Sequence, residues 1–272
     1  MLLLAAGLAL AAAPATATDV PDHWERVFPE TDFSKHSIAL DTIQEGGVPR
    51  DGIPAIDEPR FAPVEERANW LSDTEPVIGL SINGDARAYP LRVLTWHEIV
   101  NDTVGGRAVA VTYCPLCNSA MVFDARVDGQ RLTFGTTGKL RKSDLVMYDR
   151  QTESWWQQFT GKSIVGAQTG TRLEVLPSRL ESWEKFRARH PDGKVLVPKH
   201  PDFRKYGQNP YAGYDQRDRP FMFGGELPEV MPAMGRVVVV ADTAWDLRLL
   251  REKARITTDD GLGNGVFRVD DA

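Results

Sequence analysis

Runs of apolar and β-branched residues alternate with short turns through the middle of the chain. Residues 77–82 and 86–91 flank Asn83-Gly84, a dipeptide typical of a two-residue hairpin turn. Residues 108–113 form a strand of buried type that enters a turn, and residues 120–124 leave that turn as another strand. The pattern therefore predicts short antiparallel strands joined by tight turns.

Shorter runs of the same kind continue toward the C-terminus. Further strands are expected at 131–134, 145–148, 163–165, 172–176, 194–197 and 237–240. Short helices are expected at 94–100, 182–190 and 244–252. Residues 135–139 lack the full spacing of a phosphate-binding loop, so we expect a hairpin loop and no nucleotide there. These elements predict an α+β fold that is mostly β, with a few short helices.

A weak internal repeat links two parts of the chain. Residues 88–94 align with residues 244–250, and each stretch follows a β-type run and precedes a turn with Asp and Gly. This similarity predicts an internal duplication of a β-hairpin/helix unit. Chance similarity between two amphipathic segments is the alternative.

The N-terminal part divides into two segments of different character. Residues 1–17 form a short apolar run that ends in small residues, which is typical of a secretory signal peptide, although no Lys or Arg precedes the run. An uncleaved N-terminal anchor is the alternative. Residues 18–75 are rich in Asp, Glu, Pro and Gly and predict an irregular wrap around a main β-rich domain at 76–272. We therefore expect a periplasmic or secreted protein with no transmembrane segment in its mature chain.

Composition excludes several classes of protein. The formal charge is −6 and acidic and basic residues are mixed along the chain, so we expect no nucleic-acid partner. The chain has only two cysteines, too few for a scaffold built on disulfides. Seven tryptophans and eleven phenylalanines can supply a hydrophobic core instead. Among them, Trp155 and Trp156 are expected in the core rather than on a binding surface.

The two cysteines, Cys114 and Cys117, stand at the ends of a predicted β-turn between two strands. Such a turn brings its first and fourth Cα atoms within about 7 Å, and Pro115 stiffens it. This separation suits a disulfide, and it also suits two thiolates on one metal ion. The turn is therefore the main candidate for a functional site.

Metal binding, by copper or zinc, is our first hypothesis for this turn. His97 is the nearest histidine in the sequence, and Met147 and Met121 could supply a thioether. A geometric objection remains. If residues 94–100 are a helix and residues 101–106 a simple turn, the longer strand would carry Cys114 more than about 10 Å past His97. His97 would then be a helix residue bonded to nearby backbone or a carboxylate.

Two other hypotheses remain open. A static disulfide between Cys114 and Cys117 would make the protein a non-catalytic binding or structural module. A thiol–disulfide oxidoreductase needs a stabilised thiolate, but no helix follows the turn to lower the pKa of a thiol. No haem is expected, because attachment needs a histidine where Asn118 stands. The tyrosines at 206, 211 and 214 could line a cleft. No catalytic set of residues is evident in the sequence, so the question of catalysis stays open.

Several motifs resemble those of one exported bacterial and archaeal family, catalogued as domain of unknown function 3179. The similar stretches are residues 51–54, 88–102, 112–117, 146–150 and 206–211. The resemblance covers roughly residues 50–255 and implies no reaction, substrate or site. Family members usually have glycine after the second cysteine, whereas this chain has Asn118, which is less free to adopt positive φ.

Overall fold

A computed structural model describes most of the chain: residues 20–67, 70–240, 243–253, 255–259 and 264–268. The predicted signal peptide at 1–17 lies outside the described residues. The described part confirms an α+β fold that is mostly β. It contains four short α-helices, which are α1 (Asp22–Val27), α2 (Leu91–His97), α3 (Trp183–Arg189) and α4 (Leu247–Lys253). None of the described helices is long and apolar enough to cross a bilayer.

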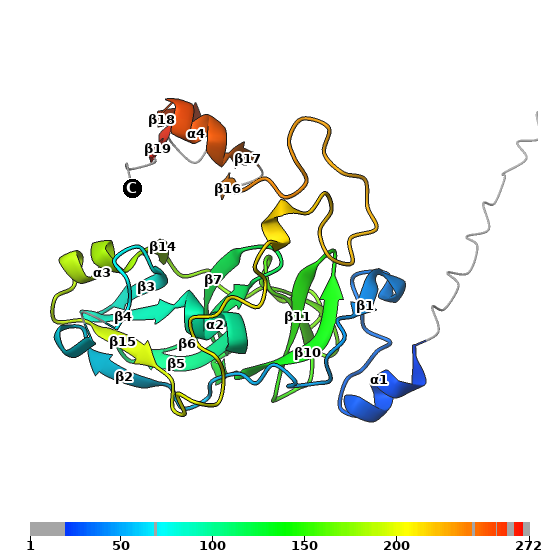
Figure 1. Ribbon diagram of the computed structural model, residues 1–272. Coiled ribbons are helices and arrows are strands. Elements are labelled where there is room, and N and C mark those ends of the chain that lie inside the picture. The colour runs from blue at the N-terminus through cyan, green and yellow to red at the C-terminus, as the bar shows by residue number, and fades with distance from the viewer. Residues whose placement is uncertain (1–19, 68–69, 241–242, 254, 260–263, 269–272) are drawn as a thin grey trace, which may run out of the picture.

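Most of the strands form two five-stranded sheets and one three-stranded sheet (Figure 1). In spatial order, the first sheet consists of β1 (Ile43–Glu45), β10 (Phe134–Arg141), β11 (Asp144–Asp149), β12 (Trp155–Gln157) and β13 (Lys162–Val165). The second consists of β14 (Arg179–Ser182), β3 (Pro76–Ile82), β4 (Asp85–Pro90), β15 (Lys194–Val197) and β2 (Arg60–Pro63). The third consists of β5 (Ile99–Val104), β6 (Arg107–Cys114) and β7 (Ser119–Asp124).

Shorter elements complete the fold. Three pairs of strands are β8 (Arg126–Val127) with β9 (Gln130–Arg131), β16 (Val237–Val240) with β17 (Thr243–Asp246), and β18 (Arg255–Asp259) with β19 (Asn264–Arg268). The single turns of 3₁₀ helix are η1 (Leu40–Thr42), η2 (Glu65–Arg67) and η3 (Tyr214–Gln216).

The hairpin predicted at Asn83-Gly84 is confirmed. Both residues have positive φ, at 50° and 83°, and the turn joins β3 to β4 in antiparallel register. Asparagine and glycine are the residues that tolerate this conformation best. Ser182 caps helix α3, because its side chain accepts a hydrogen bond from the Lys185 N–H.

The structure corrects the prediction of one helix at 94–100 followed by a turn at 101–106. Helix α2 spans Leu91–His97, and the chain then reverses at Glu98, whose φ is 58°. Residues Ile99–Val104 are strand β5, which pairs with β6 along its whole length. The β-branched residues 99 and 100 favour an extended backbone, and pairing with β6 supplies partners for its N–H and C=O groups.

Two other local predictions are wrong. Residues 135–139 are not a hairpin loop but lie inside β10, where the register shifts between Thr136 and Lys139. Residues 172–176 are not a strand and make only isolated bridges, Arg172 to Lys162 and Val175 to Phe123. In both cases the neighbouring strands, rather than the local sequence, decide whether the ladder continues.

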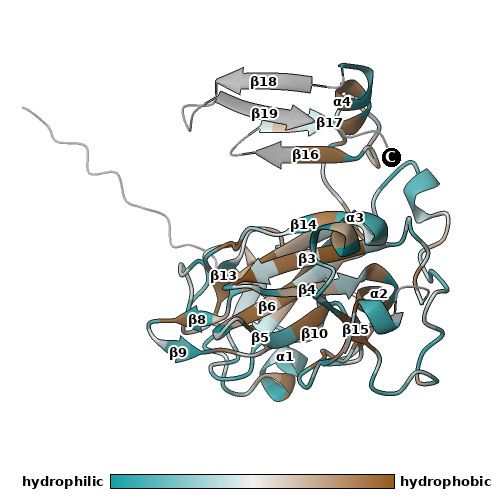
Figure 2. Ribbon diagram, turned by 90° about the vertical axis from the view of Figure 1, so that its left-hand side faces the viewer, coloured by the Kyte–Doolittle hydropathy of each residue, from teal (hydrophilic) through white to brown (hydrophobic). Residues whose placement is uncertain are grey.

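The hydrophobic core confirms the expectation for the two adjacent tryptophans. Trp155 and Trp156 are fully buried. Figure 2 shows hydrophobic colour concentrated on strands such as β3 and β15, while surface loops are largely hydrophilic. From the N-terminal part, Trp24 packs on Trp155 with ring centroids 4.9 Å apart. Residues 20–75 also contribute strands β1 and β2 to the two large sheets.

The internal repeat has a structural counterpart. In the first unit, hairpin β3–β4 leads into α2 and then into hairpin β5–β6. In the second unit, hairpin β16–β17 leads into α4 and then into hairpin β18–β19. The aligned residues Leu91 and Leu247 each begin the helix of their unit. The C-terminal unit stands beside the sheets in Figure 1, after the long segment that follows β15.

Candidate metal centre

The candidate site forms where two hairpin turns meet. Strand β6 ends at Cys114 and strand β7 starts at Ser119, so the cysteine motif is the turn between them. Asn118 closes this turn with a φ of 49°, a conformation that asparagine tolerates without a glycine. The second turn consists of Lys142 and Ser143, both with positive φ, and it joins β10 to β11.

Asp144, the first residue of β11, faces the two cysteines. The two sulfur atoms and a carboxylate oxygen of Asp144 lie within 4.8 Å of one another. The Cys117 Sγ donates a hydrogen bond to Asp144 Oδ1 at 3.2 Å. Cys114 is buried, Cys117 is exposed although its sulfur is partly covered, and neither forms a disulfide. Two thiols and one carboxylate are therefore close enough to hold a metal ion.

Two groups of this cluster, Cys117 and Asp144, have raised pKa values. The pKa of the Cys117 thiol is raised by the hydrogen bond of this thiol with Cys114 and by its burial. Burial also raises the pKa of Asp144, although the Phe159 N–H, which donates to Oδ2 at 3.0 Å, acts in the opposite direction. Cys117 is therefore a poor source of thiolate at neutral pH, unless a cation displaces its proton.

Polar atoms without partners surround the cluster. The Ser119 and Ser143 hydroxyls and the Gln158 Oε1 are buried, and no described residue hydrogen-bonds them. Ser119 and Ser143 line the same cleft as Cys117, a space of about 740 Å³ between the cysteine turn and the segment 207–237. Buried polar atoms usually have a partner. Ser119 and Ser143 therefore stand beside the cleft with hydroxyl oxygens that are buried and have no described partner.

Glu98 is a fourth chemical group near the site, and no sequence pattern singles it out. Its side chain is buried, and burial together with the charge of Asp144 raises the pKa of Glu98 to about 8. The Tyr113 N–H donates to the Glu98 carbonyl oxygen at 2.8 Å, so this residue lies beside the end of β6. The carboxylate borders a second cavity of about 380 Å³. Its position directly after His97 in the shared motif was the available signal.

His97 uses both of its ring nitrogens in hydrogen bonds. Its Nδ1 lies 2.8 Å from the Pro54 carbonyl oxygen, and its Nε2 lies 2.7 Å from the Tyr206 hydroxyl. The carbonyl can only accept, so Nδ1 donates to it and Nε2 accepts from Tyr206. Burial lowers the pKa of His97, which favours this neutral form. A ligand role for His97 stays a prediction.

The two candidate thioethers lie in the core around Cys114. Met147 is fully buried in the same hydrophobic cluster as Cys114, and Met121 packs against that cluster. A ligand role for Met147 also stays a prediction. Of the three tyrosines, Tyr211 borders both cavities, Tyr214 does so as well, and Tyr206 binds His97. The prediction that this loop could line a cleft agrees with the structure.

These observations define a class of protein. Its fold is α+β and mostly β, and its Cys-x-x-Cys turn together with one aspartate could hold a metal ion. The chain belongs to the family described as "Protein of unknown function (DUF3179)", which matches residues 50–272. No curated protein and no solved structure matches the chain.

Proposed function

We propose that the protein binds a zinc ion through Cys114, Cys117 and Asp144. The main support is the clustering of two sulfurs and a carboxylate oxygen within 4.8 Å, contributed by two hairpins of different sheets. Zinc accepts thiolate and carboxylate ligands in tetrahedral geometry. Two thiolates and one carboxylate would offset the charge of the ion and leave a net charge of −1.

Zinc fits this set of donors better than copper does. Copper(I) prefers soft sulfur and imidazole ligands, whereas Asp144 offers a hard oxygen. His97 has both ring nitrogens in hydrogen bonds, so it would have to leave Tyr206 before it could act as a ligand. A copper form with His97 or Met147 is therefore the second choice.

Three protein ligands would leave one coordination position of zinc for water or another molecule. Catalytic zinc sites have this arrangement, whereas structural sites are usually closed by four protein ligands. The cleft that Cys117 borders supports an open position. We therefore propose a site that can exchange a ligand rather than a purely structural one.

Export of the protein is part of the same proposal. The apolar run and the small residues at 1–17 support a signal peptide. In an oxidising compartment two neighbouring thiols tend to form a disulfide unless a metal holds them. A bound ion would explain how a close thiol pair persists outside the cytoplasm.

Metal analysis of the protein purified from cells tests the proposal. We expect about one equivalent of zinc per chain, and less than about a tenth of that in Cys117→Ser or Asp144→Asn, because each change removes one of three ligands. Asp124→Asn is the matched control, since Asp124 ends strand β7 and pairs with Arg107 instead. It should retain the metal.

The thiol state distinguishes the alternatives in the same samples. Wild-type protein without metal and with both cysteines oxidised would overturn the metal proposal and favour a static disulfide. Reversible oxidation in metal-free protein, at a potential well above that of a structural disulfide, would favour a thiol–disulfide oxidoreductase.

A further inference from the structure

The cavity beside Glu98 is distinct from the cleft beside Cys117. It has a volume of about 380 Å³, within the range of small-molecule sites. Its lining is largely apolar and aromatic and includes Ile53, Leu116, Leu145, Tyr211, Tyr214 and Phe221. Such a lining suits a compact ligand with an apolar body.

One buried carboxylate stands in this lining without a partner. Glu98 is 7% exposed, and no described residue donates a hydrogen bond to its carboxylate. The backbone of Glu98 is held in place, because its N–H donates to the Leu94 carbonyl oxygen and its own carbonyl accepts from the Tyr113 N–H. The φ of 58° is unfavourable for glutamate, and residues held in such strain are common at functional sites.

The other charged groups around the cavity do not neutralise Glu98. The ammonium group of Lys139 lies 2.8 and 3.0 Å from the two carboxylate oxygens of Glu45, and it faces the rings of Trp24 and Trp155. Arg217 is exposed and lies over the ring of Tyr214, so water screens its charge. Asp144 adds negative potential at Glu98.

We infer that this cavity binds a small organic cation, an ammonium group on an apolar or aromatic body, with the Glu98 carboxylate as its counter-ion. Near neutral pH the empty cavity holds Glu98 in its protonated form. An ammonium group that displaces this proton supplies both the charge and the N–H donors that a buried carboxylate needs. Tyr211, Tyr214 and Phe221 can pack against the body of the ligand, and an aromatic face also attracts a cation. The inference is independent of zinc, since Glu98 is not one of the three proposed ligands.

Benzylamine and benzyl alcohol provide a matched pair of probes, because they have the same ring and differ in charge. Calorimetric titration of wild-type protein should show benzylamine binding roughly tenfold more tightly than benzyl alcohol, since only the amine is charged. Glu98→Gln should remove this preference. Glu75→Gln is the control, because Glu75 pairs with Arg92 and borders the other cleft. It should leave the preference unchanged.

A second variant keeps the test decisive if Glu98→Gln fails to fold. Phe221 is 41% exposed, so Phe221→Ala should fold, and it should weaken benzylamine binding several-fold by removing one aromatic wall. Equal affinity for the two probes, or an unchanged preference in Glu98→Gln, would overturn the inference. Unchanged benzylamine affinity in Phe221→Ala would place any binding outside this cavity. Wild-type protein that contains no zinc but still prefers benzylamine would refute the metal proposal and leave this inference intact.

Discussion

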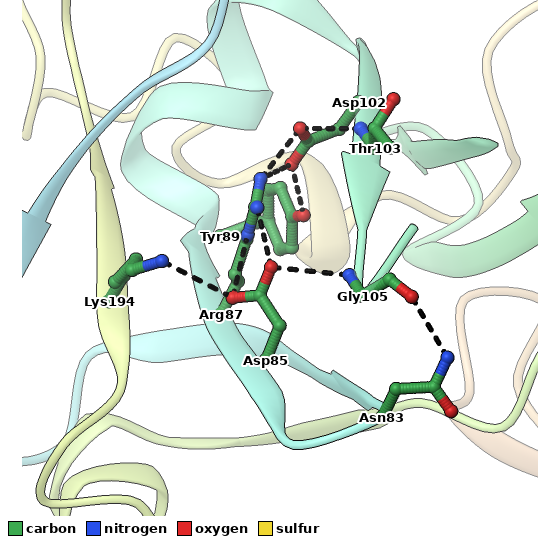
Figure 3. A network of polar contacts seen from close by, with 8 residues as sticks. All are labelled: Asn83, Asp85, Arg87, Tyr89, Asp102, Thr103, Gly105 and Lys194. Atoms are coloured by element: carbon green, nitrogen blue, oxygen red, sulfur yellow. Dashed lines mark hydrogen bonds and ion pairs between the residues drawn. The ribbon is translucent and has the colours of Figure 1, made fainter. Parts of the chain in front are cut away.

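Asp102 lies at the centre of a buried network of charged and polar side chains (Figure 3). Its carboxylate accepts hydrogen bonds from Arg87 at 2.7 and 2.8 Å and from the Tyr89 hydroxyl at 2.7 Å. Arg87 also binds Asp85, and Asp85 accepts from the Gly105 N–H. The network ties hairpin β3–β4 to the β5–β6 turn. Asp102 belongs to one of the shared family motifs, and its role here is structural.

Replacing Asp102 tests this role at the scale of one residue. Asp102→Ala should lower the free energy of unfolding by about 3 kcal/mol, because it leaves the Tyr89 hydroxyl and part of Arg87 buried without a partner. Asp85→Ala should cost about 1 kcal/mol, since the Asp85 side chain is more exposed, at 20% against 6%. Urea unfolding measures both. Equal losses of unfolding free energy in the two variants would contradict the expectation that burial sets the cost.

At the scale of elements, strand β10 depends on a backbone conformation that glycine adopts more easily than any other residue. Gly138 has a φ of 77° and lies at the register shift between Thr136 and Lys139. A Cβ atom there would collide with the Val48 carbonyl oxygen and lie 2.9 Å from the Pro49 carbonyl oxygen. The N-terminal part therefore packs directly onto the bulge of β10. The sequence showed the glycines but could not show the segment that approaches them.

Gly138→Ala should therefore destabilise the protein by more than about 3 kcal/mol, which combines the cost of positive φ with backbone overlap. Gly129→Ala is the matched control, because Gly129 has a φ of 80° and open space where its Cβ would lie. It should cost about 1–2 kcal/mol, the cost of positive φ alone. Denaturant titration of the two variants separates the two contributions. Similar values would mean that the segment at 48–49 moves aside easily.

Helix α2 and strand β5 show why the elements around the site could be predicted only in part. The sequence favoured hairpins and short strands, and the hairpin at Asn83-Gly84 followed from local geometry alone. The reversal at Glu98 did not, since glutamate has no local preference for positive φ. Because residues 99–104 form a strand, the end of β6 lies beside Glu98. The predicted distance between His97 and Cys114 assumed a different path.

At the scale of the whole molecule, the buried carboxyl of Glu98 couples stability to pH. Burial raises the pKa of Glu98 from its ordinary value of 4.5 to about 8, so the folded state holds a proton that the unfolded state loses. Between these two pH values the folded state binds more protons, and stability falls as the pH rises. Asp144, whose pKa is also raised, adds a dependence of the same sign.

We expect metal-free, reduced protein to lose roughly a few kcal/mol of stability between pH 5 and pH 8 through this effect. Glu98→Gln should flatten the curve of unfolding free energy against pH in that range. Glu174→Gln should not, because the Glu174 side chain is 66% exposed. Thermal unfolding at a series of pH values measures the difference. An unchanged slope in Glu98→Gln would show that another group dominates the dependence.

The sequence alone determined the class of fold, the turn with its two cysteines and the burial of Trp155 and Trp156, because alternation, turn residues and apolar character act locally. It could not select Asp144 or Glu98. Asp144 lies 27 residues from Cys117, on a strand of another sheet, and reaches it only because two hairpin turns meet. Long-range packing decided which side chains share the site, since a local pattern contains no information about which turns face each other.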